Sequence, residues 1–439
     1  MKLEFTFYPR TQESSFLIDE ICPETLFQNP LRAPTKAVIN KRKQCFASTI
    51  SDLVMAYFHT LDGYCFRPLE DGKFTNERFG SKVFRKVKDT LEEEMLCTTE
   101  PGTWSPTQPF ATRFYISPSV IAFAEKLGIT KENSHEHFGF HEIIQPIRAK
   151  HPKLQLGQGK VSEAKPVTNE ELVKCNNYQL LANQVLWINK YLLENHFLEG
   201  CVFTGFFRSF SEFNKKSKVH GGIREPLSSG GRLYSQAGSY QSLSQEKRLK
   251  LKIDGEPVTE IDIKASHLSL AIFTIMGMNG CVESDYPEYR FNVSKIDLYD
   301  IEEIPRPLVK QCAVQLVSKG FKSSQWGKNY KEFVAKEYNL DLSNFKFGDV
   351  KKAIYRRHPI LNTPTAKDID WGFLQRRESD ALIATVTRLA HEYAIPAYPV
   401  HDSLIVKLKD IELAEHVLSD CFFSHIGYRP HLERKTDRD

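Results

Sequence analysis

Two short segments, each carrying an aspartate where a predicted strand ends, constrain the fold of this chain more than any other feature. The first, VTEIDIKASHL (residues 258–268), begins as a β-branched strand and changes to helical spacing after Asp262. In the second, YPVHDSLIVK (residues 398–407), apolar residues flank a His-Asp-Ser triplet that we expect at a tight turn between two strands. Each segment therefore presents one carboxylate, Asp262 or Asp402, at the end of a strand.

A pair of carboxylates at strand ends suits phosphoryl transfer by two metal ions. In that mechanism the metals lie about 3.5–4 Å apart, one activating the attacking hydroxyl and the other stabilising the leaving group. Carboxylates are good ligands for Mg²⁺, which keeps several waters and takes other ligands from substrate phosphates. The ordinary alternative is that Asp262 caps a helix and Asp402 occupies a hairpin turn. The pair alone leaves both interpretations open.

A predicted helix between the two segments carries two cations on one face. In RPLVKQCAVQL (residues 306–316), Arg306 and Lys310 are four residues apart and so share a helix face. Pro307 fits the first turn of such a helix. Two cations so placed can bind a triphosphate, and Lys310 could protonate a departing pyrophosphate. The alternative is an ordinary solvated face.

Taken in this order, the three segments resemble motifs A, B and C of family A DNA polymerases and the related single-subunit phage RNA polymerases. Motif A of that family starts with a metal-binding Asp at a strand end, as Asp262 does here. Motif B has an R-x-x-x-K pattern, matched by Arg306 and Lys310, and motif C is an H-D-E or H-D-S hairpin, matched by residues 401–403. The resemblance implies that Asp262 and Asp402 bind two Mg²⁺ ions, with Mn²⁺ as a substitute.

Two further segments agree with this resemblance, which spans residues 200 to 430 approximately. GRLYS (residues 231–235) resembles the segment that precedes motif A, and LQRRESDALI (residues 374–383) resembles the long helix before motif C, where the family has a functional Gln. The expected nucleotide-binding residues are Arg306, Lys310, His267 and Lys264. The expected template and primer contacts are Arg232, Gln375, His401, Arg85, Lys82 and Arg356.

Two departures from the family pattern concern nucleotide choice. Motif B normally continues to a Tyr-Gly pair that tests the incoming base and sugar, and this chain has Ser318-Lys319-Gly320 at that point. Five residues after the motif A Asp, DNA polymerases place a Glu that excludes the ribose 2′-hydroxyl, and phage RNA polymerases have a small residue. Here that residue is His267. The choice between dNTP and NTP therefore stays open.

The order of predicted elements in the N-terminal half indicates a DNA-binding module. Helical spacing begins at Gln44, and a second helix is expected over residues 76–95, with Lys82 and Arg85 on its exposed side. A predicted strand, loop and strand follow, up to residue 116. This order matches a winged-helix module, which docks a helix in the major groove. The alternative is an ordinary helical domain with a solvated basic face.

We therefore expect an α+β fold in which a small winged-helix-like domain precedes a right-hand polymerase. The polymerase part comprises a palm with an antiparallel sheet, reduced helical fingers and a helical thumb. The expected boundaries are an irregular N-terminal segment at 1–37, the winged-helix-like domain at 38–150, a linker at 151–168, the thumb-like helical region at 169–230, and palm and fingers at 231–439.

The hydropathy and cysteine spacing of the chain argue against membrane, secreted and zinc-binding proteins. No uncharged apolar stretch reaches the length of about 18 residues that a membrane span needs, and the N-terminus lacks an apolar signal core, so we expect a cytoplasmic protein without membrane contact. The nine cysteines form no CxxC pair and no cluster with zinc spacing, which argues against a disulfide framework or structural zinc. The net charge of +4 is modest, but Lys and Arg gather locally, as at residues 351–357.

The leading hypothesis is a DNA-dependent DNA polymerase that extends a 3′-hydroxyl or primes its own chain, with a DNA template, a primer strand and dNTP as partners. The first alternative is an RNA polymerase or primase of the same fold. The second is a non-catalytic winged-helix DNA-binding protein with a degenerate polymerase domain. The arrangement also resembles compact polymerase-like proteins of phages and mobile elements.

Overall fold

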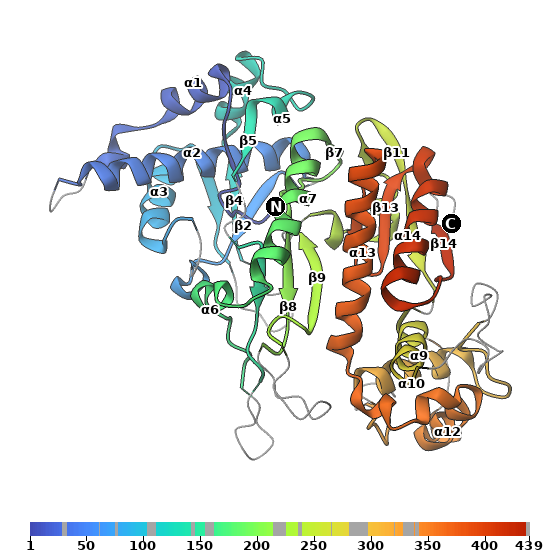
Figure 1. The fold of residues 1–439 in the computed structure, drawn as a ribbon. Helices are drawn as coiled ribbons and strands as arrows, with labels where there is room; N and C mark the ends of the chain where they lie inside the picture. The colour runs from blue at the N-terminus through green and yellow to red at the C-terminus, as the bar shows by residue number, and fades with distance from the viewer. Residues whose placement is uncertain are drawn as a thin grey trace. The chain divides into compact units, whose positions relative to one another are not determined.

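The computed structural model is of mixed α+β class, as the sequence predicts, and forms two units that each draw on three stretches of the chain (Figure 1). Unit 1 contains Met1–Pro146, Ala182–Phe207 and Tyr234–Pro257; unit 2 contains Ile147–Leu181, Arg208–Leu233 and Val258–Asp439. The structure describes residues 1–28, 33–60, 62–74, 78–102, 111–141, 145–153, 162–213, 225–235, 239–264, 266–280, 297–319, 321–327, 338 and 342–435.

The first residues of unit 1 are regular, so the prediction of an irregular segment at 1–37 is wrong. Strand β1 (Phe7–Pro9) is followed by helix α1 (Gln12–Ile21). Helix α1 starts with a capping box in which Thr11 and Ser14 satisfy each other's backbone N–H groups, and it buries Leu17 on its inner face. Pro23, Pro30 and Pro34, which suggest irregular structure, all come after this helix and so do not interrupt it.

A three-stranded antiparallel sheet with two helices forms the centre of unit 1. Strand β4 lies between β2 and β3, with Tyr64 opposite Tyr115 and Cys97 opposite Ile116. The two predicted strands are confirmed and pair with each other, the segment between them at 103–110 lies outside the described residues, and β2 was not predicted. Helix α3 starts later than the predicted residue 76 and buries Phe84, Val87 and Leu91. The bounds are α2 (Lys36–His59), β2 (Tyr64–Arg67), α3 (Ser81–Glu93), β3 (Cys97–Glu100) and β4 (Thr112–Ile116).

A buried aspartate ties the N-terminal chain to helix α2. The Asp52 carboxylate is fully buried and accepts hydrogen bonds from four successive backbone N–H groups, those of residues 4 to 7, at 2.8 to 3.2 Å. Burial raises the pKa of Asp52 to about 7, while the four N–H donors act in the opposite direction. Its oxygens thus supply acceptors for backbone groups that would otherwise be buried without partners.

The rest of unit 1 adds short elements around this core. Strand β5 pairs antiparallel with β1, placing Phe140 opposite Phe7. Strand β10 pairs with β7 and turns back into the start of β11. The bounds are α4 (Pro118–Lys126), α5 (Ser134–His137), β5 (Phe138–Phe140), α7 (Tyr178–Asn195, in this unit from residue 182), β7 (Leu198–Glu199), α8 (Gln245–Arg248) and β10 (Lys252–Ile253).

Unit 2 is organised around an antiparallel sheet. Strand β11 lies between β13 and β14, and β12 pairs with β13 on the other side. Helix α13 packs along α14, and both contact strands of the sheet (Figure 1). Residues Ile261, Leu404 and Val406 are fully buried in this layer. The bounds are β11 (Glu256–Ile263), β12 (Tyr398–Val400), β13 (Ser403–Lys407), β14 (Leu432–Lys435), α13 (Trp371–Tyr393) and α14 (Ile411–Ile426).

A group of helices adjoins one end of this sheet. Helix α9 (Ser266–Met278) follows β11 directly, and it contacts α10 (Arg306–Ser318). Helix α10 also contacts α12 (Phe347–Arg357). Pro307 lies in the first turn of α10, where its missing N–H costs nothing, so the helix predicted for this segment is confirmed.

The region predicted as a helical thumb, 169–230, is only partly helical. It contains α6 (Asn169–Val173) and α7, but also β8 (Phe206–Phe210) and the start of β9 (Gly230–Ser235). Strand β8 lies between β6 (Ile147–Ala149), to which it is parallel, and β9. Alternate side chains of β8 are buried, a period of two that the sequence interpretation missed.

Part of the predicted linker, residues 154–161, lies outside the described residues, as do Lys215, Lys216 and Lys218. In the described part of the linker, Pro166 forms an isolated bridge with Lys150, the residue just before the linker. Among the helices of the described ranges, none combines the length and apolarity needed to cross a membrane.

Candidate active site

The two aspartates singled out from the sequence lie at the same end of the unit 2 sheet. Asp262 is near the end of β11, and Asp402 lies in the tight turn between β12 and β13. Asp262 is paired across the strands with Ser403, the residue that follows Asp402. His401 has a φ of 56°, the left-handed conformation that lets the chain reverse here. The predicted strand end and hairpin are therefore both present.

Burial and the charge of Asp402 both act on the carboxylate of Asp262. The pKa of Asp262 is raised, first by burial and then by the negative charge of Asp402, while the ammonium of Lys435 acts in the opposite direction. A cation bound beside Asp262 would offset both the burial of its charge and the nearby charge of Asp402. Their oxygens are the donor type that Mg²⁺ prefers, so the residues present fit that ion.

The described residues contain no cluster of three or more His, Cys, Asp or Glu side chains arranged to hold a metal. Two carboxylates alone can still hold Mg²⁺, because this ion retains waters and takes further ligands from substrate phosphates.

The turn that carries Asp402 is held in place from β11. Ser403 Oγ donates a hydrogen bond of 2.6 Å to Glu260 Oε1 and lies 3.0 Å from the carbonyl oxygen of Val400. Ser403 and Glu260 are both buried. The Ser of the His-Asp-Ser triplet therefore links the two strands that carry the aspartates.

An aromatic pair and an ion pair lie beside the aspartates. The ring of His267, in the first turn of α9, lies 4.3 Å from that of Trp371, at the start of α13. Arg232 on β9 donates through Nε (3.0 Å) and Nη2 to Glu378 Oε2, and Glu378 is fully buried. The Arg232 guanidinium also lies 5.9 Å above the Trp371 ring. These contacts connect β9, α9 and α13.

The pKa of His267 is affected by charged groups from several elements of the site. Burial lowers it, the positive charges of Arg232 and Lys310 lower it further, and the carboxylates of Glu378 and Asp402 raise it. The net shift is downward, so the imidazole is neutral at pH 7. Lys310 and Asp402, far apart in the sequence, thus both act on His267.

Helix α10 carries the predicted cation pair. Arg306, in its first turn, forms an ion pair with Asp297 in which Nη2 lies 3.3 Å from Oδ1. The Arg306 guanidinium lies 5.5 Å above the ring of the buried Tyr299. Lys310 is exposed one turn later.

The predicted residue Lys264 binds Glu433 on β14, with Nζ 2.7 Å from Oε1. Gln375 is half-buried on α13, one turn after Trp371 and three residues before Glu378, so it shares their helix face. His401 is exposed in the hairpin turn.

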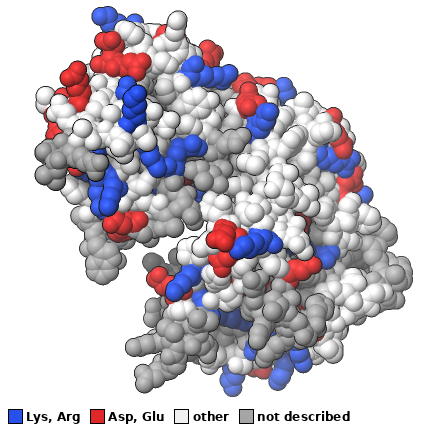
Figure 2. Space-filling view, turned by 60° about the vertical axis from the view of Figure 1, so that its left-hand side comes forward, with Lys and Arg blue, Asp and Glu red and all other residues white. Residues whose placement is uncertain are grey.

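Three predicted contacts lie on other elements. Arg356 is exposed in the last turn of α12. Lys82 and Arg85 are exposed on α3 of unit 1, where Arg85 forms a 2.9 Å ion pair with Asp71. On the face shown in Figure 2, basic and acidic side chains alternate in small groups.

Sequence interpretation missed Trp371, Glu378, Asp297 and Glu433. A charged residue at a position of α13 that faces the core was a signal for Glu378, because a buried carboxylate requires a partner. The partners of Asp297 and Glu433 are set by tertiary contacts that no local pattern displays.

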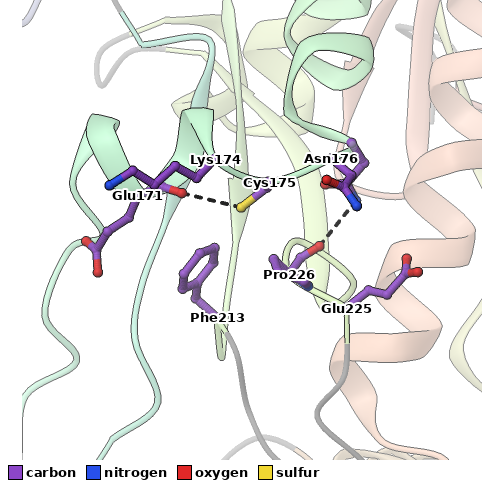
Figure 3. A pocket seen from close by; sticks show the side chains of 8 residues that line it. Glu171, Lys174, Cys175, Asn176, Phe213, Glu225 and Pro226 are labelled. Atoms are coloured by element: carbon purple, nitrogen blue, oxygen red, sulfur yellow. Dashed lines mark hydrogen bonds between the residues drawn. The ribbon is translucent and has the colours of Figure 1, made fainter.

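A cavity of unit 2, of about 400 Å³, is lined by none of these residues (Figure 3). Its wall includes Glu171, Glu225 and Lys174 and a single aromatic ring, that of Phe213. The Cys175 thiol is directed to the Glu171 carbonyl at 3.5 Å, and burial raises its pKa. A protonated thiol with two nearby carboxylates provides neither a nucleophile nor an anion site.

Comparisons with known proteins add little. No protein-family model matches the chain, and no curated protein matches it. Among solved structures, it is similar to the POL domain of Pol1 from M. smegmatis, solved in complex with DNA primer-template and dNTP. That similarity has a TM-score of 0.30 and 8% identity, and covers 92% of this chain and 69% of the other. Functional inference therefore rests on the residues of the site.

Proposed function

We propose that unit 2 is a template-directed nucleic-acid polymerase that uses two-metal phosphoryl transfer, and that it acts as a DNA-dependent DNA polymerase. The observation that carries this proposal is the position of Asp262 and Asp402 at one end of an antiparallel sheet, with His267 within the electrostatic range of both Asp402 and Lys310. The match to motifs A, B and C supports the same function from the sequence.

In this proposal Asp262 and Asp402 hold two Mg²⁺ ions. When bound, these ions activate a 3′-hydroxyl for attack and stabilise the leaving pyrophosphate. The protein contributes by fixing the carboxylates before the ions arrive. The cross-strand pairing of Asp262 with Ser403, and the hydrogen bond from Ser403 to Glu260, hold the two strands in register.

Arg306 and Lys310 bind the triphosphate of the incoming nucleotide in this proposal. Arg306 is already paired with Asp297, so a phosphate must compete with that carboxylate for the guanidinium. A planar guanidinium binds phosphate through two parallel hydrogen bonds. Lys310 carries an ammonium that can transfer a proton to the departing pyrophosphate.

The neutral imidazole of His267 lies where family A DNA polymerases have a carboxylate. Its ring lies tilted against that of Trp371 and presents an apolar face and a polar edge. Arg232, predicted to contact template or primer, has two guanidinium nitrogens committed to Glu378, so we assign it a positioning role for Trp371.

The architectural assignments follow from the same proposal. The sheet of β12, β13, β11 and β14 serves as the palm, and α10 and α12 serve as reduced fingers. In unit 1, the β2-β4-β3 sheet with α2 and α3 serves as a winged-helix-like module. Lys82 and Arg85 of α3 and Arg356 of α12 bind phosphates of the DNA backbone, which fixes register without reading sequence. Gln375 and His401 contact template or primer.

The test is a primer-extension assay with purified full-length protein, Mg²⁺ and a single-stranded DNA template, with and without an annealed primer. Labelled dNTPs and NTPs are supplied separately. Asp262→Asn and Asp402→Asn proteins run alongside Asp349→Asn, a matched control because Asp349 is an exposed carboxylate on α12 outside the site. Product that requires Asp262 and Asp402 but not Asp349 supports the polymerase.

The same assay separates the alternatives. Product from NTPs, with or without a primer, supports an RNA polymerase or primase. No product under any condition, from protein that still binds DNA, contradicts the proposal and supports a non-catalytic DNA-binding protein.

A further inference from the structure

A cavity of about 770 Å³ in unit 1 lies between the β1–β5 strand pair and helix α7. All of its lining residues belong to unit 1, so it is separate from the candidate active site of unit 2. The volume falls within the range of small-molecule sites, about 300–1,000 Å³. The lining combines aromatic rings with charged side chains: Tyr8, Arg10, His141, Trp187, Lys190 and Glu194.

Two aromatic rings in the lining remain accessible. Tyr8 on β1 is 37% exposed and Trp187 on α7 is 38% exposed, although large rings are usually buried. They come from different elements, so the cavity has aromatic surface on both walls. Exposed rings beside a cavity offer flat faces for another planar group.

The orientation of each ring is set by its neighbours. The Tyr8 ring lies 4.8 Å from the His141 ring and rests on Gly139, where an added Cβ would be 2.6 Å from Tyr8 Cζ. The Trp187 indole stacks on Tyr191, one turn along α7, at an interplanar angle of 4°. Neither face therefore needs to be organised when a ligand binds, which reduces the entropy cost of binding.

Charged side chains at the cavity favour an anion beside the rings. Arg10 and Lys190 are exposed and come from the two opposite walls. Glu194 is the acidic residue in the lining, one turn from Lys190 on α7. Burial, with Arg78 nearby, lowers the pKa of His141 to about 4, so at pH 7 its ring is neutral.

We propose that this cavity binds an unpaired nucleotide of single-stranded DNA, with the base stacked on Tyr8 and Trp187 and the flanking phosphates bound by Arg10 and Lys190. Aromatic faces combined with cations characterise binding of single strands without sequence preference, because every base has a stacking face. The inference rests on the proposed function only in the choice of DNA as the ligand.

The stacking part is tested by fluorescence anisotropy with a fluorescein-labelled (dT)12 oligonucleotide and full-length protein in EDTA. Tyr8→Ala and Trp187→Ala are each expected to weaken binding about tenfold. Tyr8→Phe and Trp187→Tyr keep a ring and should stay within about twofold of wild type. Gly139→Ala should reproduce part of the Tyr8→Ala loss, because the new Cβ displaces the ring.

Matched controls lie outside the cavity. Tyr57→Ala removes an exposed tyrosine of α2, and Leu180→Ala removes an exposed apolar residue of α7. Neither should change the affinity. Thermal melts of all variants identify any that fail to fold. If the alanine variants do not fold, the affinities of the ring-retaining variants and of Gly139→Ala for (dT)12 decide whether the two rings contact the base.

The phosphate part is tested by salt dependence. Arg10→Gln and Lys190→Gln should each weaken binding and reduce the slope of log affinity against log salt by about 0.7, the value for one phosphate contact on a single strand. Glu194→Gln should strengthen binding, because it removes the negative charge beside the proposed phosphate.

The outcomes are distinguishable from those of the polymerase assay, since binding is measured without metal or nucleotide. If primer extension fails while Tyr8→Ala and Trp187→Ala still lose affinity for (dT)12, the cavity proposal survives and the polymerase proposal does not. Unchanged affinity in both alanine variants, or equal losses in the Tyr57 and Leu180 controls, overturns the cavity proposal. If the protein binds a labelled (rU)12 oligonucleotide in the same assay but does not bind (dT)12, DNA is not the ligand of the cavity.

Discussion

An aspartate in each unit illustrates two uses of the same side chain. Asp52 in unit 1 is fully buried, and four backbone N–H groups donate to its oxygens. Asp262 in unit 2 is half-buried, and its pKa is raised first by burial and then by the second carboxylate, Asp402. Burial raises the pKa of Asp52 to about 7, but four donors of the same chain offset part of that cost. The second carboxylate near Asp262 instead adds to the cost of its ionisation.

The difference indicates which carboxylate is structural and which is functional. A buried charge whose acceptors are all occupied contributes to the fold, because every lone pair has a donor in the same chain. A carboxylate held against another carboxylate costs folding free energy, and such arrangements concentrate at functional sites. The predictions below test this contrast, from the largest expected effect to the smallest.

The largest effect is expected on catalysis. Asp262→Asn and Asp402→Asn should each reduce primer extension by at least about a thousandfold, because a metal-binding carboxylate is lost. Asp52→Asn should leave activity per folded molecule close to wild type. Equal losses in all three, measured on protein whose folded fraction is known, would remove the contrast between the two aspartates.

A second effect concerns Glu378, a buried carboxylate whose partner is a side chain. Arg232→Met leaves the Glu378 charge buried without its ion pair, so we expect a loss of about 3–5 kcal/mol in the free energy of unfolding in urea. Arg429→Met is the control, because Arg429 pairs with Asp420 at an exposed position. That change should cost less than about 1 kcal/mol. Similar costs for the two variants would show that burial does not decide the value of the pair.

A third effect tests Asp52 directly. Asp52→Asn replaces one acceptor oxygen by an NH₂ group, so two of the four N–H groups face a donor. We expect the free energy of unfolding to fall by about 2–4 kcal/mol, measured in urea at pH 8. The N-terminal strand should also lose protection in amide hydrogen exchange. A stability loss without any change in exchange at residues 4 to 7 would contradict this explanation.

The smallest effect has the opposite sign. Because the folded-state pKa of Asp262 is raised, its ionisation opposes folding: this contribution to stability is complete below the unfolded-state pKa and is lost as pH rises through the folded value. Asp402→Asn relieves the repulsion and should therefore stabilise the protein by about 1 kcal/mol at pH 8 in EDTA.

The pH dependence provides the control for that measurement. The advantage of Asp402→Asn in thermal melts should disappear at a pH low enough to protonate Asp262, since a neutral carboxyl is not repelled. Adding Mg²⁺ at pH 8 should raise the melting temperature of wild type more than that of Asp402→Asn. A variant less stable than wild type in EDTA at pH 8 would contradict the repulsion.

Some features were predictable because their signals are local. The strand end at Asp262, the hairpin at Asp402 and the helix with Arg306 and Lys310 each depend on spacing within about ten residues. The structure contains all three elements where they were expected. Strands β3 and β4 were likewise predicted, whereas helix α1 and its capping box lie in the segment 1–37 that was predicted to be irregular.

The sequence by itself determined which residues carry charge and which segments form strands and helices, because these follow from side-chain chemistry and short-range periodicity. Only the tertiary structure decided that Asp52 meets the backbone of residues 4 to 7, that Glu378 meets Arg232, and that the ring of His267 contacts that of Trp371. These partners are separated by 45 to 146 residues. Contacts over such distances depend on how whole elements pack, and no local pattern encodes that packing.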